Sequence, residues 1–144
     1  MIFREITIQF VYMNVTTQLK LLINLARIDG DVDSKEHRYI LNIGKANGAT
    51  EQEVEQLMTQ SHEVIIPQNL SDDQRFELIF NLVQLMKIDE RLFENEIKYC
   101  SQMAARLGYR QLVMLDLMMN VKSIEMEQGE IDSLRKLTAK YLTK

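Results

Sequence analysis

Two short acidic turns carry the carboxylates that could do chemistry in this chain. The first turn, residues 29–36, reads Asp-Gly-Asp-Val-Asp-Ser-Lys-Glu. Its first and last residues, Asp29 and Glu36, recur 60 positions later as Asp89 and Glu96. Carboxylate oxygens are the ligands that Ca²⁺ and Mg²⁺ take in proteins, so a divalent cation is one use of these side chains.

Each aspartate is predicted at the C-terminal end of a helix, where the dipole disfavours a negative charge by about 0.3–1 kcal/mol. A compensating partner is expected: a backbone N–H group of the turn, a basic side chain or a metal ion. Glu36 also has a local explanation, because Asp33 is a good N-cap and Glu36 then completes a capping box. Phe93 replaces Asp33 in the second turn and cannot cap, so capping does not explain Glu96.

The first turn also supplies two secondary candidate ligands, Asp31 and Asp33. Its Asp-x-Asp-x-Asp run is not an EF-hand, because Ser34 stands where the loop needs glycine and Ile40 where it needs glutamate. Turn-stabilising acids or an acidic docking surface are the alternatives to a metal site.

The elements that position these turns are predicted to be helices. Apolar residues recur at i, i+3, i+4 and i+7, with Leu19, Leu22, Ile23 and Ala26 as one example. Single residues at helix ends also fit, including a capping box that begins at Thr50. The patterns predict seven helices, over 15–29, 34–47, 51–62, 71–89, 94–107, 110–121 and 131–142. Residues 1–14 contain alternating apolar side chains and predict a short extended segment or an N-terminal tail.

An internal repeat organises the predicted helices. Shifting the chain by 60 residues aligns 22–58 with 82–118, and nine of the 37 positions are identical. The sequence therefore predicts an all-α domain over 15–144, built from two tandem three-helix pseudo-repeats (about 15–62 and 75–121) and a closing helix over 131–142. The identical pairs are Leu22/Leu82, Leu25/Leu85, Ile28/Ile88, Asp29/Asp89, Glu36/Glu96, Tyr39/Tyr99, Gly48/Gly108, Leu57/Leu117 and Met58/Met118.

Composition narrows the function classes. The chain has 144 residues, 46% of them hydrophobic and 26% charged, with a net charge of −4. Scattered basic residues argue against a nucleic-acid partner, and no run is long enough to insert into a membrane. The single cysteine, Cys100, forms no intramolecular disulfide, and a cytoplasmic location is expected. Catalytic motifs are lacking, which argues against an enzyme.

Three isolated side chains carry weak signals. His37 follows Glu36, but the repeat has Ile97 at that place, so it is expected to be exposed or partly packed. His62 is expected to make a local contact near a helix end, and Cys100 to be a small buried hydrophobe. The nine methionines could form an adaptable binding surface, although core filling is the favoured use.

The doubled turn, in which a helix runs into Asp-Gly and a glutamate follows, resembles the TerB-like (tellurite-resistance) family over residues 15–142 or so. The resemblance implies an all-α domain whose acidic turns form a suspected metal-binding surface, with Asp29, Glu36, Asp89 and Glu96 at the matching positions. It also implies association with tellurite resistance and with membrane-linked stress-response complexes. The second turn departs from the family pattern, since Glu90 replaces glycine and Arg91 stands opposite Asp31.

Two functions follow from the sequence. One is a non-enzymatic TerB-like domain that holds Ca²⁺, Mg²⁺ or Zn²⁺ between the acidic turns in a metal-stress response. The other is a metal-free helical adaptor that docks a protein partner through its acidic face or through residues 1–13. The sequence leaves a homodimer open.

Overall fold

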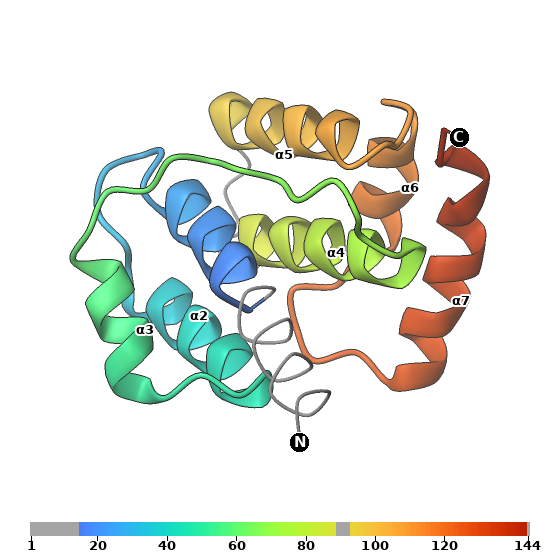
Figure 1. Cartoon of the computed structure of the whole chain (residues 1–144). Coiled ribbons are helices and arrows are strands. Elements are labelled where there is room, and N and C mark those ends of the chain that lie inside the picture. Colours follow the sequence, from blue (N-terminus) through green and yellow to red (C-terminus); the bar gives the residue numbers. More distant parts are fainter. Residues whose placement is uncertain (1–14, 89–92, 144) are drawn as a thin grey trace, which may run out of the picture. The chain divides into compact units, whose positions relative to one another are not determined.

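The computed structural model describes residues 15–88 and 93–143. Within these ranges the chain is all-helical and contains no strand, so the predicted all-α class of seven helices is confirmed (Figure 1). One isolated β-bridge pairs Tyr109 with Leu142. None of the helices in the described part of the chain is long and apolar enough to cross a membrane.

The chain divides into two compact units, Met1–Ile65 and Ile66–Lys144. The predicted extended segment, residues 1–14, lies outside the described residues, as does Asp89 of the second acidic turn.

Unit 1 contains a helix over residues 15–26, α2 (Ser34–Ala46) and α3 (Glu51–Met58). Its core is formed by side chains from all three helices, including Leu22, Ile40 and Val54, which are fully or almost fully buried. Gly44 of α2 lies at the point of closest approach, because a Cβ there would be 2.6 Å from a methyl of Val54. Glycine is therefore needed at this position for α2 and α3 to pack together.

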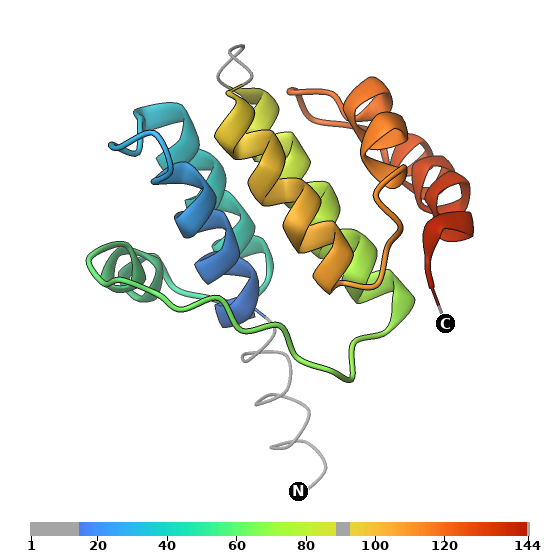
Figure 2. The same ribbon diagram turned by 90° about the horizontal axis from the view of Figure 1, so that it is seen from above.

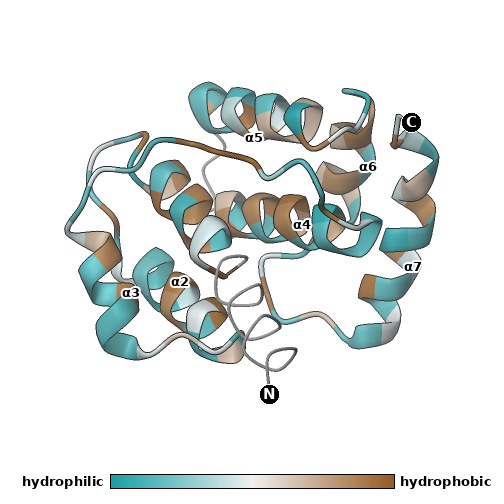
Figure 3. Ribbon diagram, viewed as in Figure 1, coloured by the Kyte–Doolittle hydropathy of each residue, from teal (hydrophilic) through white to brown (hydrophobic). Residues whose placement is uncertain are grey.

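Unit 2 contains α4 (Asp72–Ile88), α5 (Glu94–Arg106), α6 (Val113–Asn120), α7 (Gln128–Thr138) and a 3₁₀ turn, η1 (Ala139–Tyr141). Side chains of α4 are buried nearly all round over residues 78–86, and α4 packs against α5 and α6 (Figures 2 and 3). Most of these buried side chains are apolar, as expected of a helix in the interior, and the buried Asn81 and Gln84 are the polar exceptions. α7 packs against α6, whereas both α5 and α6 pack against α4. α4 is therefore the central helix of this unit.

The helix boundaries differ from prediction by three or four residues at four helices. The helix predicted over 15–29 ends at residue 26, and the helix predicted over 110–121 begins at Val113. α7 ends at Thr138 rather than at residue 142, and η1 follows it. α3 ends at Met58 rather than at residue 62. Its last carbonyl groups have side-chain partners in place of backbone N–H groups of a further turn: His62 Nε2 lies 2.7 Å from the carbonyl oxygen of Leu57. α7 begins at Gln128 rather than at residue 131. Glu127 is its N-cap residue, and the Glu130 carboxylate accepts the N–H of Glu127 at 3.2 Å, which stabilises a helix start before residue 131.

Positions 60 residues apart adopt the same local structure in the two units. α2 and α5 each have 13 residues and begin at Ser34 and Glu94. Each is followed by a glycine with positive φ, at Gly48 (100°) and Gly108 (95°), a conformation that glycine adopts without strain. The repeat of complete three-helix units remains a prediction.

Candidate functional site

The first acidic turn is open to solvent at its start and engaged at its end. Asp29 and Asp31 are exposed, and Gly30 takes a φ of 117° between them. Asp33 is the N-cap of α2: its Oδ1 accepts the N–H of Glu36 at 2.8 Å, and Glu36 Oε1 accepts the N–H of Asp33 at 3.3 Å. The predicted capping box is therefore confirmed, and it occupies the buried Glu36 with a structural contact.

The second turn lacks this cap. Phe93 is the N-cap residue of α5 and makes no side-chain capping bond, as predicted. Glu96 is nevertheless buried, with 2% of its surface exposed. Asp89 lies outside the described residues. Of the four predicted metal ligands, the structure thus places Asp29 and Glu36 in unit 1 and Glu96 in unit 2.

Within residues 15–88 and 93–143, no group of three or more His, Cys, Asp or Glu side chains could hold a metal ion. His37 instead pairs with Glu55 at 2.6 Å and links α2 to α3. Cys100 is fully buried, as expected. Burial and then the charge of Glu96 raise the pKa of its thiol to about 12, so it is a poor nucleophile at neutral pH.

A basic side chain at the end of each unit's first helix binds carbonyl groups of a later segment. In unit 1, the Arg27 guanidinium donates to the carbonyls of Met58 and Gln60, the latter at 2.5 Å. In unit 2, the Lys87 ammonium donates to the carbonyls of Met118, at 2.7 Å, and Val121. Both cations neutralise the negative end of a helix, α3 or α6.

The sequence did not assign these roles to Arg27 and Lys87. The only signal was that Arg27 and Lys87 are 60 positions apart, and that Met58 and Met118, which accept their respective hydrogen bonds, are also 60 positions apart. A buried or half-buried cation needs an acceptor, and here the acceptors lie 31 residues further along the chain in each unit.

A surface of α6 and α7 presents large apolar side chains to solvent, and we call it the α6–α7 surface. It consists of Leu112, Leu115, Met119 and Leu137, which are 61%, 63%, 82% and 41% exposed. The first three follow one another at i, i+3 and i+7, so they form one stripe along α6. A contiguous exposed apolar patch is typical of a binding site, whereas scattered single residues are not.

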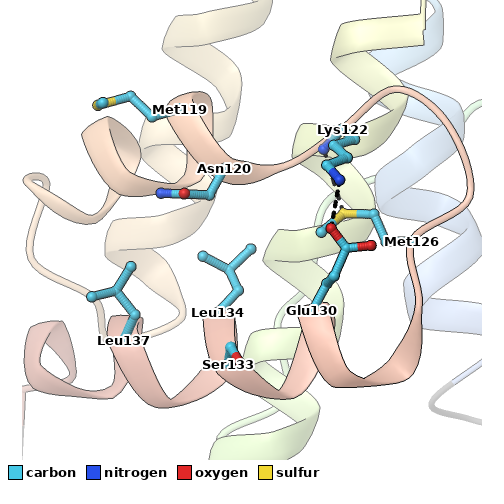
Figure 4. Close-up of a pocket in the computed structure, with 8 residues that line it drawn as sticks. All are labelled: Met119, Asn120, Lys122, Met126, Glu130, Ser133, Leu134 and Leu137. Atoms are coloured by element: carbon cyan, nitrogen blue, oxygen red, sulfur yellow. Dashed lines mark hydrogen bonds and ion pairs between the residues drawn. The ribbon is translucent and has the colours of Figure 1, made fainter.

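The stripe continues into a groove with a volume of about 280 Å³ between the end of α6 and α7. Figure 4 shows Leu134 and Leu137 of α7 pointing across the groove toward the end of α6. At the other end Lys122 Nζ and Glu130 Oε2 form an ion pair of 2.5 Å. Their hydrogen bond raises the pKa of Lys122 and lowers the pKa of Glu130, so both stay charged at neutral pH.

The methionines only partly fill the core. Met114 and Met126 are buried, as the favoured reading expected, but Met119 is the most exposed large apolar side chain of the described residues. The available sequence signal was the apolar character of both faces of α6, which has buried Val113 and Leu117 on one side and the exposed stripe on the other.

Comparison of the chain with protein-family models, with curated proteins and with solved structures finds no match. The resemblance to the TerB-like family therefore stays a prediction based on the acidic turns.

Proposed function

We propose that this chain is a non-enzymatic, cytoplasmic adaptor that binds an amphipathic helix of another protein on its α6–α7 surface. The observation that carries the proposal is the exposed stripe of Leu112, Leu115 and Met119, which leads into the groove lined by Leu137. This reading keeps the adaptor function expected from the sequence but moves its docking surface from the acidic turns to unit 2.

The shape of the surface favours a helical ligand. Seven residues of helix span about 10 Å, so the stripe offers contacts along two turns of a partner. Helix-in-groove recognition uses apolar anchors at i, i+3 or i+4, and i+7, which is the spacing that the stripe presents. Met119 suits such a site because a flexible thioether adapts to different partner side chains.

The charges at the two ends of the surface indicate which charges a partner helix should carry. Next to Leu112, Arg110 and Lys140 both lie over the ring of Tyr141, with the Arg110 Cζ 5.9 Å and the Lys140 Nζ 5.1 Å from its centroid. Near the other end, the Lys122–Glu130 pair has no net charge. We therefore expect a partner helix with an apolar face and acidic residues at the end that meets Arg110 and Lys140.

A peptide-display selection tests the proposal. Helical peptides of about 20 residues are selected on the full chain, and binders that also recognise Met119→Glu are discarded. We expect enrichment of peptides with apolar residues at i, i+4 and i+7 and with Asp or Glu at one end. Binding of a selected peptide is expected to weaken about tenfold or more in Leu115→Glu, because hot-spot side chains carry most of the binding energy.

The matched control is Ile65→Glu, which changes an apolar side chain that is 67% exposed in unit 1. It should leave peptide binding unchanged. The proposal would be overturned if no amphipathic peptide is enriched or if Leu115→Glu binds as well as wild type. Self-association that Met119→Glu abolishes would instead assign the surface to a second copy of this chain.

A divalent-cation site in a tellurite or metal-stress response stays a separate hypothesis, supported by the family resemblance and by the exposed carboxylates of Asp29 and Asp31. A thermal titration of chelator-treated protein with Ca²⁺, Mg²⁺ and Zn²⁺ tests it. A site of this kind predicts a saturable rise in melting temperature that the Asp29→Ala/Asp89→Ala double variant loses. An unchanged melting temperature at millimolar cation would reject it and leave the adaptor proposal untouched.

A further inference from the structure

A second concave site lies in unit 2 at the C-terminal end of α5, and the two charged residues that line it are both arginines. Arg75 of α4 and Arg106 of α5 border a pocket of about 270 Å³, together with Gln68 and Thr143. Among the described residues, no aspartate or glutamate lines this pocket, although the chain as a whole has a net charge of −4. Two guanidinium groups that share one pocket indicate a negatively charged ligand.

The backbone of the pocket is held in a fixed arrangement. Gly108 has a φ of 95°, and its carbonyl oxygen accepts the N–H of Thr143 at 2.7 Å and the hydroxyl of Thr143 at 2.8 Å. A Cβ at position 108 would lie 3.4 Å from Arg75 Nη1, so the guanidinium lies close against this turn.

Arg75 keeps donors available for a ligand. Its ion pair with Asp72 is long, at 3.8 Å, and Asp72 is 77% exposed, so solvent screens the attraction. A guanidinium carries five N–H donors, and one distant carboxylate does not use them all. Gln68 is exposed and adds a neutral amide donor at the rim.

We propose that this pocket binds a small oxyanion, a phosphate or a carboxylate group, through Arg75 and Arg106. Arginine suits both groups because its planar fork donates two parallel hydrogen bonds to oxygen atoms of one anion. The volume lies just below the usual 300–1,000 Å³ of drug-sized sites, which fits a small anionic group rather than a large molecule.

The competing explanation is purely structural. Arg106 lies in the last turn of α5 and Arg75 beside it, where the negative end of the helix dipole stabilises cations in the absence of a ligand. That explanation predicts no dependence on the anion, so a titration separates the two.

Calorimetric titration and thermal unfolding of the full chain, with sodium phosphate or sodium acetate at ionic strength held constant with NaCl, test the proposal. We expect a saturable response to at least one anion. In Arg75→Gln and in Arg106→Gln the affinity should fall about tenfold or more, because each loses charge-assisted hydrogen bonds. Arg38→Gln, which removes the same charge from an exposed position on α2, should bind as wild type.

The two anions distinguish the ligand class: a response to phosphate alone assigns a phosphate group, and a response to acetate assigns a carboxylate. No saturable response to either anion, or equal responses in wild type and both pocket variants, would overturn the proposal. Circular dichroism first establishes that each variant is folded. If Arg75→Gln is not folded, Arg75→Lys replaces it, since lysine keeps the charge but lacks the fork.

Discussion

The ammonium group of Lys87 donates a hydrogen bond of 2.7 Å to the carbonyl oxygen of Met118, 31 residues further along the chain. Arg27 makes the corresponding bond to Met58 in unit 1. Each contact joins the end of one helix to the end of another, because α4 ends at Ile88 and α6 at Asn120. Arg27 and Lys87 are 60 residues apart, and so are Met58 and Met118. Each unit therefore makes the same contact at corresponding positions of its sequence.

Replacing Lys87 is expected to destabilise the protein. Lys87→Met keeps most of the aliphatic stem but removes the charged donor from the Met118 and Val121 carbonyls. Hydrogen bonds from a charged group contribute about 1.5–3 kcal/mol, so the free energy of unfolding in urea should fall by about that amount. The control is Lys98→Met on the exposed face of α5. An equal effect of the two substitutions would contradict the assigned role of Lys87.

Phe93→Asp should build a missing N-cap. The backbone of Phe93 is extended, with φ −85° and ψ 137°, and Glu96 stands at the third helical position, as Glu36 does behind Asp33. An N-cap contributes about 0.5–2 kcal/mol. Phe93→Asp should therefore unfold at higher urea concentration than Phe93→Ala, which removes the ring without supplying a cap. Conversely, Asp33→Ala should lower the free energy of unfolding by about 1 kcal/mol. No change in stability in either experiment would show that these caps do not contribute to stability.

Gly44→Ala should weaken the packing in unit 1. The new Cβ would meet a Val54 methyl at 2.6 Å and a Leu19 methyl at 3.3 Å, closer than packed atoms tolerate. Overpacking costs about 1–3 kcal/mol, and the better helix propensity of alanine returns about 1 kcal/mol of it. Gly129→Ala in α7 is the matched control, because nothing lies within 4 Å of a Cβ there, and it should leave stability unchanged or raise it. The second substitution Val54→Ala should relieve the clash in Gly44→Ala.

Alkaline pH should destabilise the fold partly through Cys100. Burial raises the pKa of its thiol from 9.0 to about 12, so between these values the unfolded chain releases a proton that the folded chain keeps. The free energy of unfolding then falls as pH rises through this window, by up to about 1.4 kcal/mol per pH unit from this group. Below the window the thiol is protonated in both states and contributes no pH dependence.

Urea unfolding of wild type and Cys100→Ala from pH 8 to 11 checks this expectation. Burial raises the pKa of Tyr109 to about 12 and also raises the pKa of Tyr99, whose ordinary value is 10.0 as for Tyr109, so below pH 10 the difference in slope reports on the thiol. Cys100→Ala should show the shallower decline. Parallel curves would mean that the thiol is accessible to solvent in the folded state.

Local features of the fold could be predicted from the sequence. The predicted capping pairs Asp33–Glu36 and Thr50–Glu53 both make the reciprocal bonds expected of them. Ser71 and Gln74 make the same pair of bonds at the start of α4. These bonds join residues within one helical turn, so residue type and spacing suffice to predict them. The periodicity of apolar residues predicted which segments are helical for the same reason.

The sequence predicted less about the surroundings of the proposed metal ligands. Spacing singled out Glu36 and Glu96 as a repeated pair of carboxylates, but spacing does not show that both are buried in their own units or that Glu36 is used in a cap. Burial depends on which neighbouring helices cover a side chain, and that information is spread over distant parts of the chain.

By itself, the sequence determined an all-α chain, the places where most helices begin and end, and a 60-residue correspondence between two acidic turns. Tertiary structure decided that Lys87 binds the end of α6, that Leu115 and Met119 face solvent rather than the core, and that Arg75 and Arg106 share a pocket. The physical reason is that helix formation rests on hydrogen bonds to residues four positions away, whereas exposure and side-chain pairing depend on contacts between helices far apart in the chain.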